Sequence, residues 1–254
     1  MSSRMNRLKH GLWKLRNSVF AVTWQQNLSA KRHLEHWIFE KALATPAGAM
    51  VLDAGSGSAP FRQLLGHTHY ESADHLKNDS EYYPPTYACD FRAIPVPNGR
   101  YDRVLCTQVL EHVPDPAGVL KELGRVLKDD GEIWLSARLF FEEHEGPYDF
   151  FRYTQWGFRQ LASLAGLEVK ELGWVEGYHA TLAHQLSIAA QELAPSYVSR
   201  VARWYEFLPL HIMVFALRIQ FGVLARIFTS LDLREPDTRH GMCINYRMVL
   251  IKAR

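Results

Sequence analysis

The junction between a short apolar run, Met50-Val51-Leu52, and the segment Asp53-Ala54-Gly55-Ser56-Gly57 constrains the fold more than any other stretch. Glycines adopt left-handed backbone dihedrals and let a ligand approach where a Cβ atom would block it. A buried strand that opens into such a turn is typical of α/β sheets that bind nucleotide-like ligands at their carboxyl edge. We therefore expect a strand over residues 50–53, a binding turn, and a helix starting near Pro60, since proline suits the first helical position.

Two kinds of ligand use a turn of this type, dinucleotides and S-adenosylmethionine (SAM). A dinucleotide site needs a third glycine three residues after the second, and that position is Pro60 here. Asp53 would repel a pyrophosphate, whereas it would attract the sulfonium and amino groups of SAM. The turn therefore favours SAM, and an NAD-dependent enzyme is the alternative.

From residue 50 to residue 174 short apolar runs alternate with amphipathic segments, a pattern that predicts a parallel α/β sheet. We expect helices over 115–128, with Val119 and Leu123 on its apolar face, and after Thr154, burying Phe158, Leu161 and Leu164. The expected strands cover residues 50–53, 69–73, 86–89, 101–106, 132–137, 167–173 and 244–251. The predicted fold is a Rossmann-like, seven-stranded, mostly parallel sheet with helices on both faces and a helical insertion before the last strand.

The domain organisation follows from these patterns. We expect residues 1–45 to form an N-terminal basic amphipathic helical segment and residues 46–175 to form the SAM-binding α/β core. We expect residues 176–240 to form a helical insertion that an open sheet does not need, and residues 241–254 to return to the core as its final strand. The length of 254 residues fits one elaborated domain better than two.

Four ordered segments resemble the class I SAM-dependent methyltransferases, in particular bacterial small-molecule methyltransferases of glycan and secondary-metabolite pathways. The segments are Val51–Gly57, Asp74, Cys89–Pro95 and Tyr101–Val113, and the resemblance covers roughly residues 45–175 plus the last strand. It implies a SAM-dependent methyltransferase that acts on a small-molecule, sugar or lipid-linked acceptor. No metal site is expected, because the three cysteines are scattered and form no CxxC pair.

The predicted cofactor-binding residues follow successive strands. Asp74 closes the second strand and suits the two ribose hydroxyls. Asp90 and Phe91 follow the third strand, where they would meet the adenine, and Gln108 follows the fourth. The full predicted set is Asp53, Gly55, Ser56, Gly57, Asp74, Asp90, Phe91 and Gln108.

The polar, aromatic-rich segment from His144 to Thr154 follows the fifth strand, on the same carboxyl edge of the sheet. We expect it to line the acceptor site, with Asp149 and Arg152 as a structural ion pair in the alternative interpretation. The predicted substrate-binding residues are Tyr148, Asp149, Arg152 and Tyr153. If the acceptor is a poorly ionised hydroxyl, His144 or His112 is the candidate general base.

The ends of the chain suggest where the protein acts. Residues 1–20 carry five basic side chains and no acid, beside an apolar stripe over residues 5–19. Such a helix either contacts a membrane surface peripherally or packs on the sheet as a lid. The run from Phe207 to Leu231 is apolar but interrupted by charges, so no spanning segment is expected. We expect a cytoplasmic monomer or homodimer, peripheral on the inner membrane surface in one interpretation.

Two other functions fit the pattern less well. A protein that binds SAM without turnover is disfavoured by the intact cofactor turn. A nucleic-acid methyltransferase would need an Asn/Asp-Pro-Pro-Tyr/Phe stretch after the fourth strand, where Thr107-Gln108-Val109-Leu110 stands instead. No broad basic groove is apparent, so nucleic acid is not an expected partner.

Overall fold

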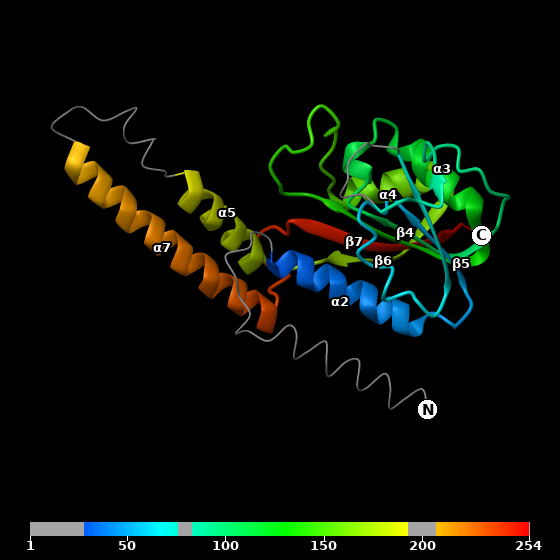
Figure 1. Cartoon of the computed structure of the whole chain (residues 1–254), viewed down its shortest axis with the longest axis horizontal. Helices are drawn as coiled ribbons and strands as arrows, with labels where there is room; N and C mark the ends of the chain where they lie inside the picture. Colours follow the sequence, from blue (N-terminus) through cyan, green and yellow to red (C-terminus); the bar gives the residue numbers. More distant parts are fainter. Residues whose placement is uncertain (1–27, 76–82, 193–206, 254) are drawn as a thin grey trace. The chain divides into compact units, whose positions relative to one another are not determined.

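The computed structural model describes residues 28–75, 83–192 and 207–253, which fall into two compact units (Figure 1). An α/β unit comprises residues 35–175 and 244–254, and a helical unit comprises residues 176–243 with the chain up to residue 34. The predicted basic helix over residues 5–19 lies outside the described residues. The helix α2, Leu28–Ala44, runs across the boundary at residue 34, whereas the sequence placed that boundary at 45.

The α/β unit is built on a seven-stranded sheet in the order β3-β2-β1-β4-β5-β7-β6. The strand order reverses between β1 and β4, and their carboxyl ends lie at this switch point, where open α/β sheets bind ligands. All pairs are parallel except those made by β7. The strands are β1 (Met50–Ala54), β2 (His69–Asp74), β3 (Tyr87–Ala88), β4 (Tyr101–Thr107), β5 (Leu127–Arg138), β6 (Leu167–Trp174) and β7 (Asn245–Lys252). The predicted fold class is confirmed.

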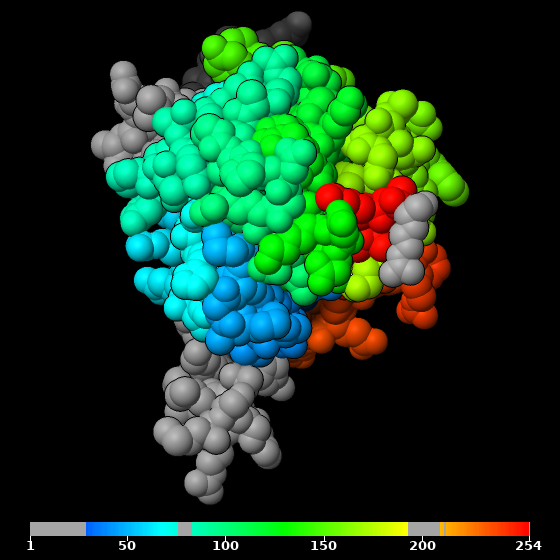
Figure 2. Space-filling model, turned by 90° about the vertical axis from the view of Figure 1, so that its right-hand side faces the viewer, coloured from blue at the N-terminus to red at the C-terminus, as the bar shows by residue number. Residues whose placement is uncertain are grey.

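The last strand enters the sheet between β5 and β6 and runs antiparallel to both. Figure 2 shows the end of β7, in red, beside green residues near the start of β5 and yellow-green residues near β6. There the Lys252 ammonium donates a hydrogen bond of 2.9 Å to Asp129 on β5. Met248, Val249 and Leu250 are buried, as expected for a strand covered on both faces.

Helices cover both faces of the sheet, with α3 and α4 on one side and α2 on the other (Figure 1). The helix α3 (Pro116–Val126) begins at the Asp115 cap, and α4 (Gln155–Leu164) begins at the predicted cap, Thr154. Phe158 is buried as expected, but the prediction for Leu164 was wrong, because that side chain is 64% exposed. Ala162, one turn after Phe158, occupies the buried face instead.

The helix expected near Pro60 is not present. Residues 60–67 form consecutive turns. The backbone N–H of Arg62 donates to the Ala59 carbonyl and that of Leu64 to the Phe61 carbonyl, each across three residues. Ala59 has a left-handed φ of 53°, and only Leu65 makes the four-residue bond of an α-helix within this stretch. The segment between the glycine turn and β2 is therefore short and tightly wound rather than helical.

The helical unit contains α5 (Tyr178–Glu192) and α7 (Phe207–Arg234), which pack against each other. Asp232 joins the elements of this unit: its fully buried carboxylate accepts hydrogen bonds from Ser29, from His33 at 3.1 Å and from the Gly177 backbone at 2.9 Å. A buried carboxylate is stable only when hydrogen-bonded in this way. The insertion is helical, as predicted, in the part that the structure describes.

The stretch Ile212–Arg234 of α7 is long and apolar enough to cross a membrane, and only 17% of its most apolar window is buried. The sequence alone suggested no spanning segment, because three basic or histidine side chains interrupt the run. The low burial distinguishes α7 from the core helix of a globular domain.

We predict effects of very different size from two apolar truncations on α4. Phe158→Ala should lower the free energy of unfolding of the α/β unit by about 3–5 kcal/mol, because Phe158 stacks on Tyr153 and is almost fully buried. Leu164→Ala on the exposed face should change it by less than about 0.5 kcal/mol. Urea denaturation of both variants tests this, and equal losses would contradict the assigned faces.

Candidate functional site

The turn after β1 has the backbone geometry that its glycines were expected to provide. Gly55 and Gly57 have φ angles of 81° and 50°, in the left-handed region that favours glycine. A Cβ atom on Gly55 would lie 2.2 Å from Cγ2 of Val109, which follows β4. Only glycine therefore lets the β1 turn approach the chain after β4 this closely.

Asp74 at the end of β2 lies against this turn. Its Oδ2 accepts a hydrogen bond of 2.7 Å from the Gly57 backbone N–H, and its Oδ1 accepts one of 2.7 Å from the His75 backbone N–H. The carboxylate is thus held at the turn, with lone pairs left for further donors such as ribose hydroxyls.

Two buried polar atoms beside the turn lack a hydrogen-bond partner among the described residues, Ser56 Oγ and Gln108 Oε1. Gln108 is held in a left-handed conformation with a φ of 56°, and its amide Nε2 donates to Ser136 Oγ at 3.1 Å. Strained residues persist where surrounding structure holds them and cluster at ligand sites. These polar atoms and the glycine cradle fit a nucleoside ligand with hydroxyl and amino groups.

A cavity of about 510 Å³ lies at this edge of the sheet. Of the predicted cofactor residues, it is lined by Gly55, Gly57, Asp74, Asp90, Phe91 and Gln108; its other lining residues are His75, Arg92, Val109, His112, Val113, Pro114, Asp115, Val119, Glu145, Tyr148 and Phe150. Residues from four strand ends and from the 144–154 loop therefore meet in one space.

The other predicted residues lie next to the cavity without lining it. Asp53 and Ser56 are buried beneath the turn, and His144, Asp149, Arg152 and Tyr153 lie in the loop. The individual roles of all these side chains remain predictions. Sequence reasoning missed His75, Arg92 and Val109; each directly follows a predicted site residue, and this proximity was the available signal.

The carboxylate of Asp53 is buried and accepts a hydrogen bond of 2.7 Å from the Tyr70 hydroxyl. The pKa of Asp53 is raised to about 6, mainly by burial and in addition by the nearby Asp74, while the Tyr70 hydrogen bond acts to lower it. A negative charge at this position therefore carries a desolvation cost in the folded protein.

Asp90 and Phe91 form the wall of the cavity after β3. The Asp90 carboxylate is bound by the Arg92 side chain and backbone, with Arg92 Nη2 donating to Oδ2 at 2.6 Å. These hydrogen bonds lower the pKa of Asp90 to about 2, so it is ionised at neutral pH. The buried ring of Phe91 lies 4.8 Å from the ring of His75. The cavity therefore has aromatic surface next to the Asp90 carboxylate.

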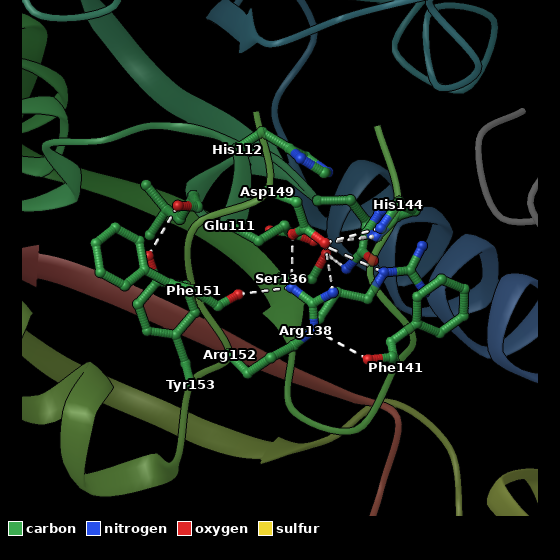
Figure 3. Close-up of polar contacts among 12 residues, drawn as sticks. Glu111, His112, Ser136, Arg138, Phe141, His144, Asp149, Phe151, Arg152 and Tyr153 are labelled. Atoms are coloured by element: carbon green, nitrogen blue, oxygen red, sulfur yellow. Dashed lines mark hydrogen bonds and ion pairs between the residues drawn. The ribbon is translucent and has the colours of Figure 1, made fainter. Parts of the chain in front are cut away.

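The loop after β5 is held by an ion pair. Arg152 donates two hydrogen bonds to the Asp149 carboxylate, at 2.6 and 2.7 Å, and Asp149 also accepts from the His144 backbone at 2.8 Å (Figure 3). These contacts hold the pKa of Asp149 well below its usual range. The Tyr153 hydroxyl donates to the Leu110 carbonyl at 2.8 Å, which ties the loop to the segment after β4.

A buried acid–base pair behind the loop was not expected from the sequence. The Glu111 side chain is fully buried, and its Oε1 lies 3.7 Å from Arg138 Nε at the end of β5 (Figure 3). Burial raises the pKa of Glu111, while the Arg138 charge opposes this. The backbone carbonyl of Glu111 also accepts from the Phe150 N–H at 2.8 Å, so this residue anchors the loop beside the cavity.

Of the two candidate bases, His112 lines the cavity and His144 does not. His112 Nδ1 lies 2.7 Å from the Tyr148 carbonyl, and since a carbonyl only accepts, this nitrogen carries the proton. The neutral ring of His112 therefore keeps Nε2 as an acceptor. The His144 ring packs edge-on against His112 at 4.7 Å, and burial lowers the pKa of His144, which favours its neutral form.

No group of three or more His, Cys, Asp or Glu side chains that could hold a metal ion occurs within residues 28–75, 83–192 and 207–253.

Residues 52–135 match the family model of the methyltransferase domain. The matched segment contains the glycine turn, Asp74, Asp90 and the stretch Gln108–His112, but neither the 144–154 loop nor the helical unit.

A curated relative, the ubiquinone biosynthesis O-methyltransferase of Acinetobacter baylyi, is 31% identical over 118 residues, which are 40% of this chain and 48% of that protein. The chain thus spans about half the length of the curated relatives it matches. Two solved structures share the fold: the YcgJ protein of Bacillus subtilis (TM-score 0.51, 13% identity, 87% of this chain and 99% of that one), and the [4+2]-cyclase SpnF (TM-score 0.52, 15% identity, 87% and 80%).

The strand order, the glycine turn and the family match agree. Residues 52–135 of the α/β unit are a methyltransferase domain of the class I SAM-dependent type, and SAM is the cofactor of this type.

We predict that Gly55→Val abolishes SAM binding, because a side chain there meets Val109 and the φ of 81° becomes strained. Asp74→Ala should weaken binding roughly ten- to hundredfold, since the ribose hydroxyls lose their acceptor. Gly157→Ala is the control, because its new Cβ meets only Thr154 Oγ1, at 3.7 Å. Titration calorimetry measures the SAM affinity of each variant. Unchanged SAM affinity in both site variants, or tighter binding of NAD than of SAM, would contradict the assignment.

A pH effect should follow from Asp53. Because its pKa is raised from 3.8 to about 6 on folding, the folded state keeps a proton that the unfolded chain has lost in this range. The free energy of unfolding should therefore fall as pH rises from about 3, below both pKa values, to about 7, above both, by about 3 kcal/mol from this group. Asp53→Asn should remove this part of the pH dependence and make the ligand-free protein more stable at pH 7. Urea denaturation across the range measures it, and an identical pH profile in the variant would rule the effect out.

Proposed function

We propose that the protein is a SAM-dependent methyltransferase that methylates a hydroxyl group of a small-molecule or lipid-linked acceptor. The observation that carries the proposal is the composition of the cavity. The glycine turn and Asp74 line one part of it, and His112, Tyr148 and Phe150 line another. A cofactor site and a candidate base with aromatic neighbours therefore share one space.

The cofactor supplies the reactive group, so the protein has to bind and align. When bound, SAM supplies a methyl group whose bond to sulfur breaks as the acceptor oxygen bonds to the methyl carbon, leaving S-adenosylhomocysteine. Gly55, Gly57 and Asp74 would hold the nucleoside, and Asp90 and Phe91 would meet the adenine. Such alignment at near-attack distance can remove about 7–11 kcal/mol of a reaction barrier.

A hydroxyl acceptor must lose a proton, and His112 is the better placed of the two candidate bases. The hydrogen bond from Nδ1 to the Tyr148 carbonyl leaves Nε2 to accept that proton. His144 lies outside the cavity lining, and we propose that it supports His112 through their ring contact. The Asp149–Arg152 pair and Tyr153 would contribute to acceptor binding by holding Tyr148 and Phe150 in place.

The surface of the loop favours an acceptor with an apolar part. Tyr148 is 56% exposed and Phe150 43% exposed, although both line the cavity. Phe151 and Trp156, further along the loop and α4, are exposed as well. The curated relatives are O-methyltransferases of ubiquinone biosynthesis, which supports O-methylation of an acceptor with an apolar portion. A sugar linked to a lipid fits the same description.

The fold alone does not fix the reaction, because a [4+2]-cyclase shares it. The direct test is to incubate the purified chain with isotope-labelled SAM and with lipid, glycan and small-molecule extracts. Mass spectrometry should then find a labelled product whose label lies on oxygen. SAM binding without any labelled product would favour the non-catalytic alternative.

We further propose that the protein is cytoplasmic, as a monomer or homodimer, and that the basic residues at positions 4–16 contact the inner membrane surface. These residues lie outside the described part of the chain. The support is their charge, because each basic side chain near an anionic leaflet contributes about 1 kcal/mol of attraction.

His112→Gln should lower kcat by about 10²–10⁴-fold while leaving SAM affinity unchanged, because glutamine can keep the bond to Tyr148 but cannot act as a base. His69→Gln, at the exposed start of β2, is the matched control. Rates are measured with the acceptor found in the labelling experiment. Loss of SAM binding in His112→Gln, or an unchanged kcat, would remove the assigned role.

A further inference from the structure

One face of α7 carries large apolar side chains along most of its length. They recur every three or four residues, which places them on one stripe of the helix. The exposed stripe consists of Ile212, Phe215, Ile219, Val223, Ile227 and Leu231. It extends for about 29 Å at the rise of an α-helix, close to the hydrocarbon thickness of a bilayer, which is about 30 Å.

The charged side chains of this stretch avoid the stripe. Between residues 212 and 231 they are Arg218 and Arg226, and both are partly buried. The Arg218 guanidinium donates to the Ala190 carbonyl on α5 at 2.9 Å, so it faces the neighbouring helix. After Arg226, the next charged residues along α7 are the buried Asp232 and Arg234, which follow the end of the stripe. The exposed face of α7 over these residues is therefore uncharged.

We propose that α7 is embedded in the hydrocarbon region of a lipid bilayer, with this stripe against the acyl chains. A helix that lies in the membrane surface needs a strongly charged face opposite its apolar one, and α7 has apolar side chains nearly all round. Close helix–helix contact in a membrane favours small residues, whereas this stripe consists of Ile, Phe, Val and Leu. Within a membrane, lipid therefore fits the stripe better than a second embedded copy of the chain does.

The C-terminal end of α7 leaves the hydrocarbon at a defined point. Asp232 is bound by Ser29, His33 and Gly177 within the folded helical unit. A polar, hydrogen-bonded cluster of this kind is costly in hydrocarbon, so the membrane-embedded part of α7 ends before it. This proposal does not depend on methyl transfer, although a membrane-embedded helix suits a lipid-linked acceptor.

Flotation with neutral phosphatidylcholine vesicles tests the proposal. The full chain, synthesised in a cell-free system with the vesicles present, should float with them and stay bound in high salt and in alkaline carbonate. The double variant Ile219→Glu/Ile227→Glu should lose partitioning, on the order of a hundredfold for each charge placed in the hydrocarbon. Leu164→Glu is the matched control: it replaces a 64% exposed leucine in the α/β unit, and it should float like the unchanged chain.

Calorimetric SAM affinity, measured on each variant, reports on folding separately from membrane binding, and an unchanged value shows an intact α/β unit. Two results would overturn the proposal. In the first, the chain floats only with anionic vesicles and is released by salt, which would leave membrane contact to the basic N-terminal residues. In the second, it stays in solution as a dimer that Ile219→Glu converts to a monomer, which would make a second copy the occupant of the stripe. If the protein showed no methyl transfer, the interpretation of these flotation results would not change.

Discussion

The approach of Gly55 to Val109 is the contact on which the candidate site depends. It brings the turn after β1 to the chain after β4, at the point where the strand order reverses. A side chain at position 55 would not fit against Val109, so the backbone of Gly55 lines the cavity directly. Asp74 reinforces the arrangement by accepting from the Gly57 N–H. The remaining walls, from β3 and from the loop after β5, are useful only because the Gly55 backbone has a fixed position.

The loop beside the cavity is held in place by two pairs of oppositely charged side chains that do not themselves line the cavity. Asp149 and Arg152 hold the loop, while the buried Glu111 lies behind it beside the half-buried Arg138. Buried pairs of this kind contribute little net stability, but removing one partner is costly. Their effect here is positional: they fix the backbone whose carbonyl, at Tyr148, orients His112. Asp53 has a similar cost, because burial raises the pKa of its carboxyl group and a negative charge there lowers the stability of the folded protein.

Most of the α/β unit could be predicted from the sequence because its elements are specified locally. The apolar runs of β1 and β4, the caps Asp115 and Thr154 and the glycine turn each act over a few residues. The errors arose where distant contacts decide. Pro60 begins a series of turns rather than a helix, and Leu164 faces solvent because Ala162 takes the place against the sheet. Likewise, the residues around Glu111 in the chain do not predict its contact with Arg138, which lies 27 positions later at the end of β5.

The sequence by itself determined the class of fold, the cofactor turn and the strand ends that supply Asp74, Asp90 and Gln108, since periodicity and turn chemistry are local properties. Only the tertiary structure decided which of two histidines lines the cavity, that Asp149 and Arg152 bind each other, and that α7 keeps an uncharged face exposed. Those features depend on how side chains from separate elements meet. Burial and partner choice are properties of the packed molecule, and a local pattern carries no information on which of its residues will face a neighbour.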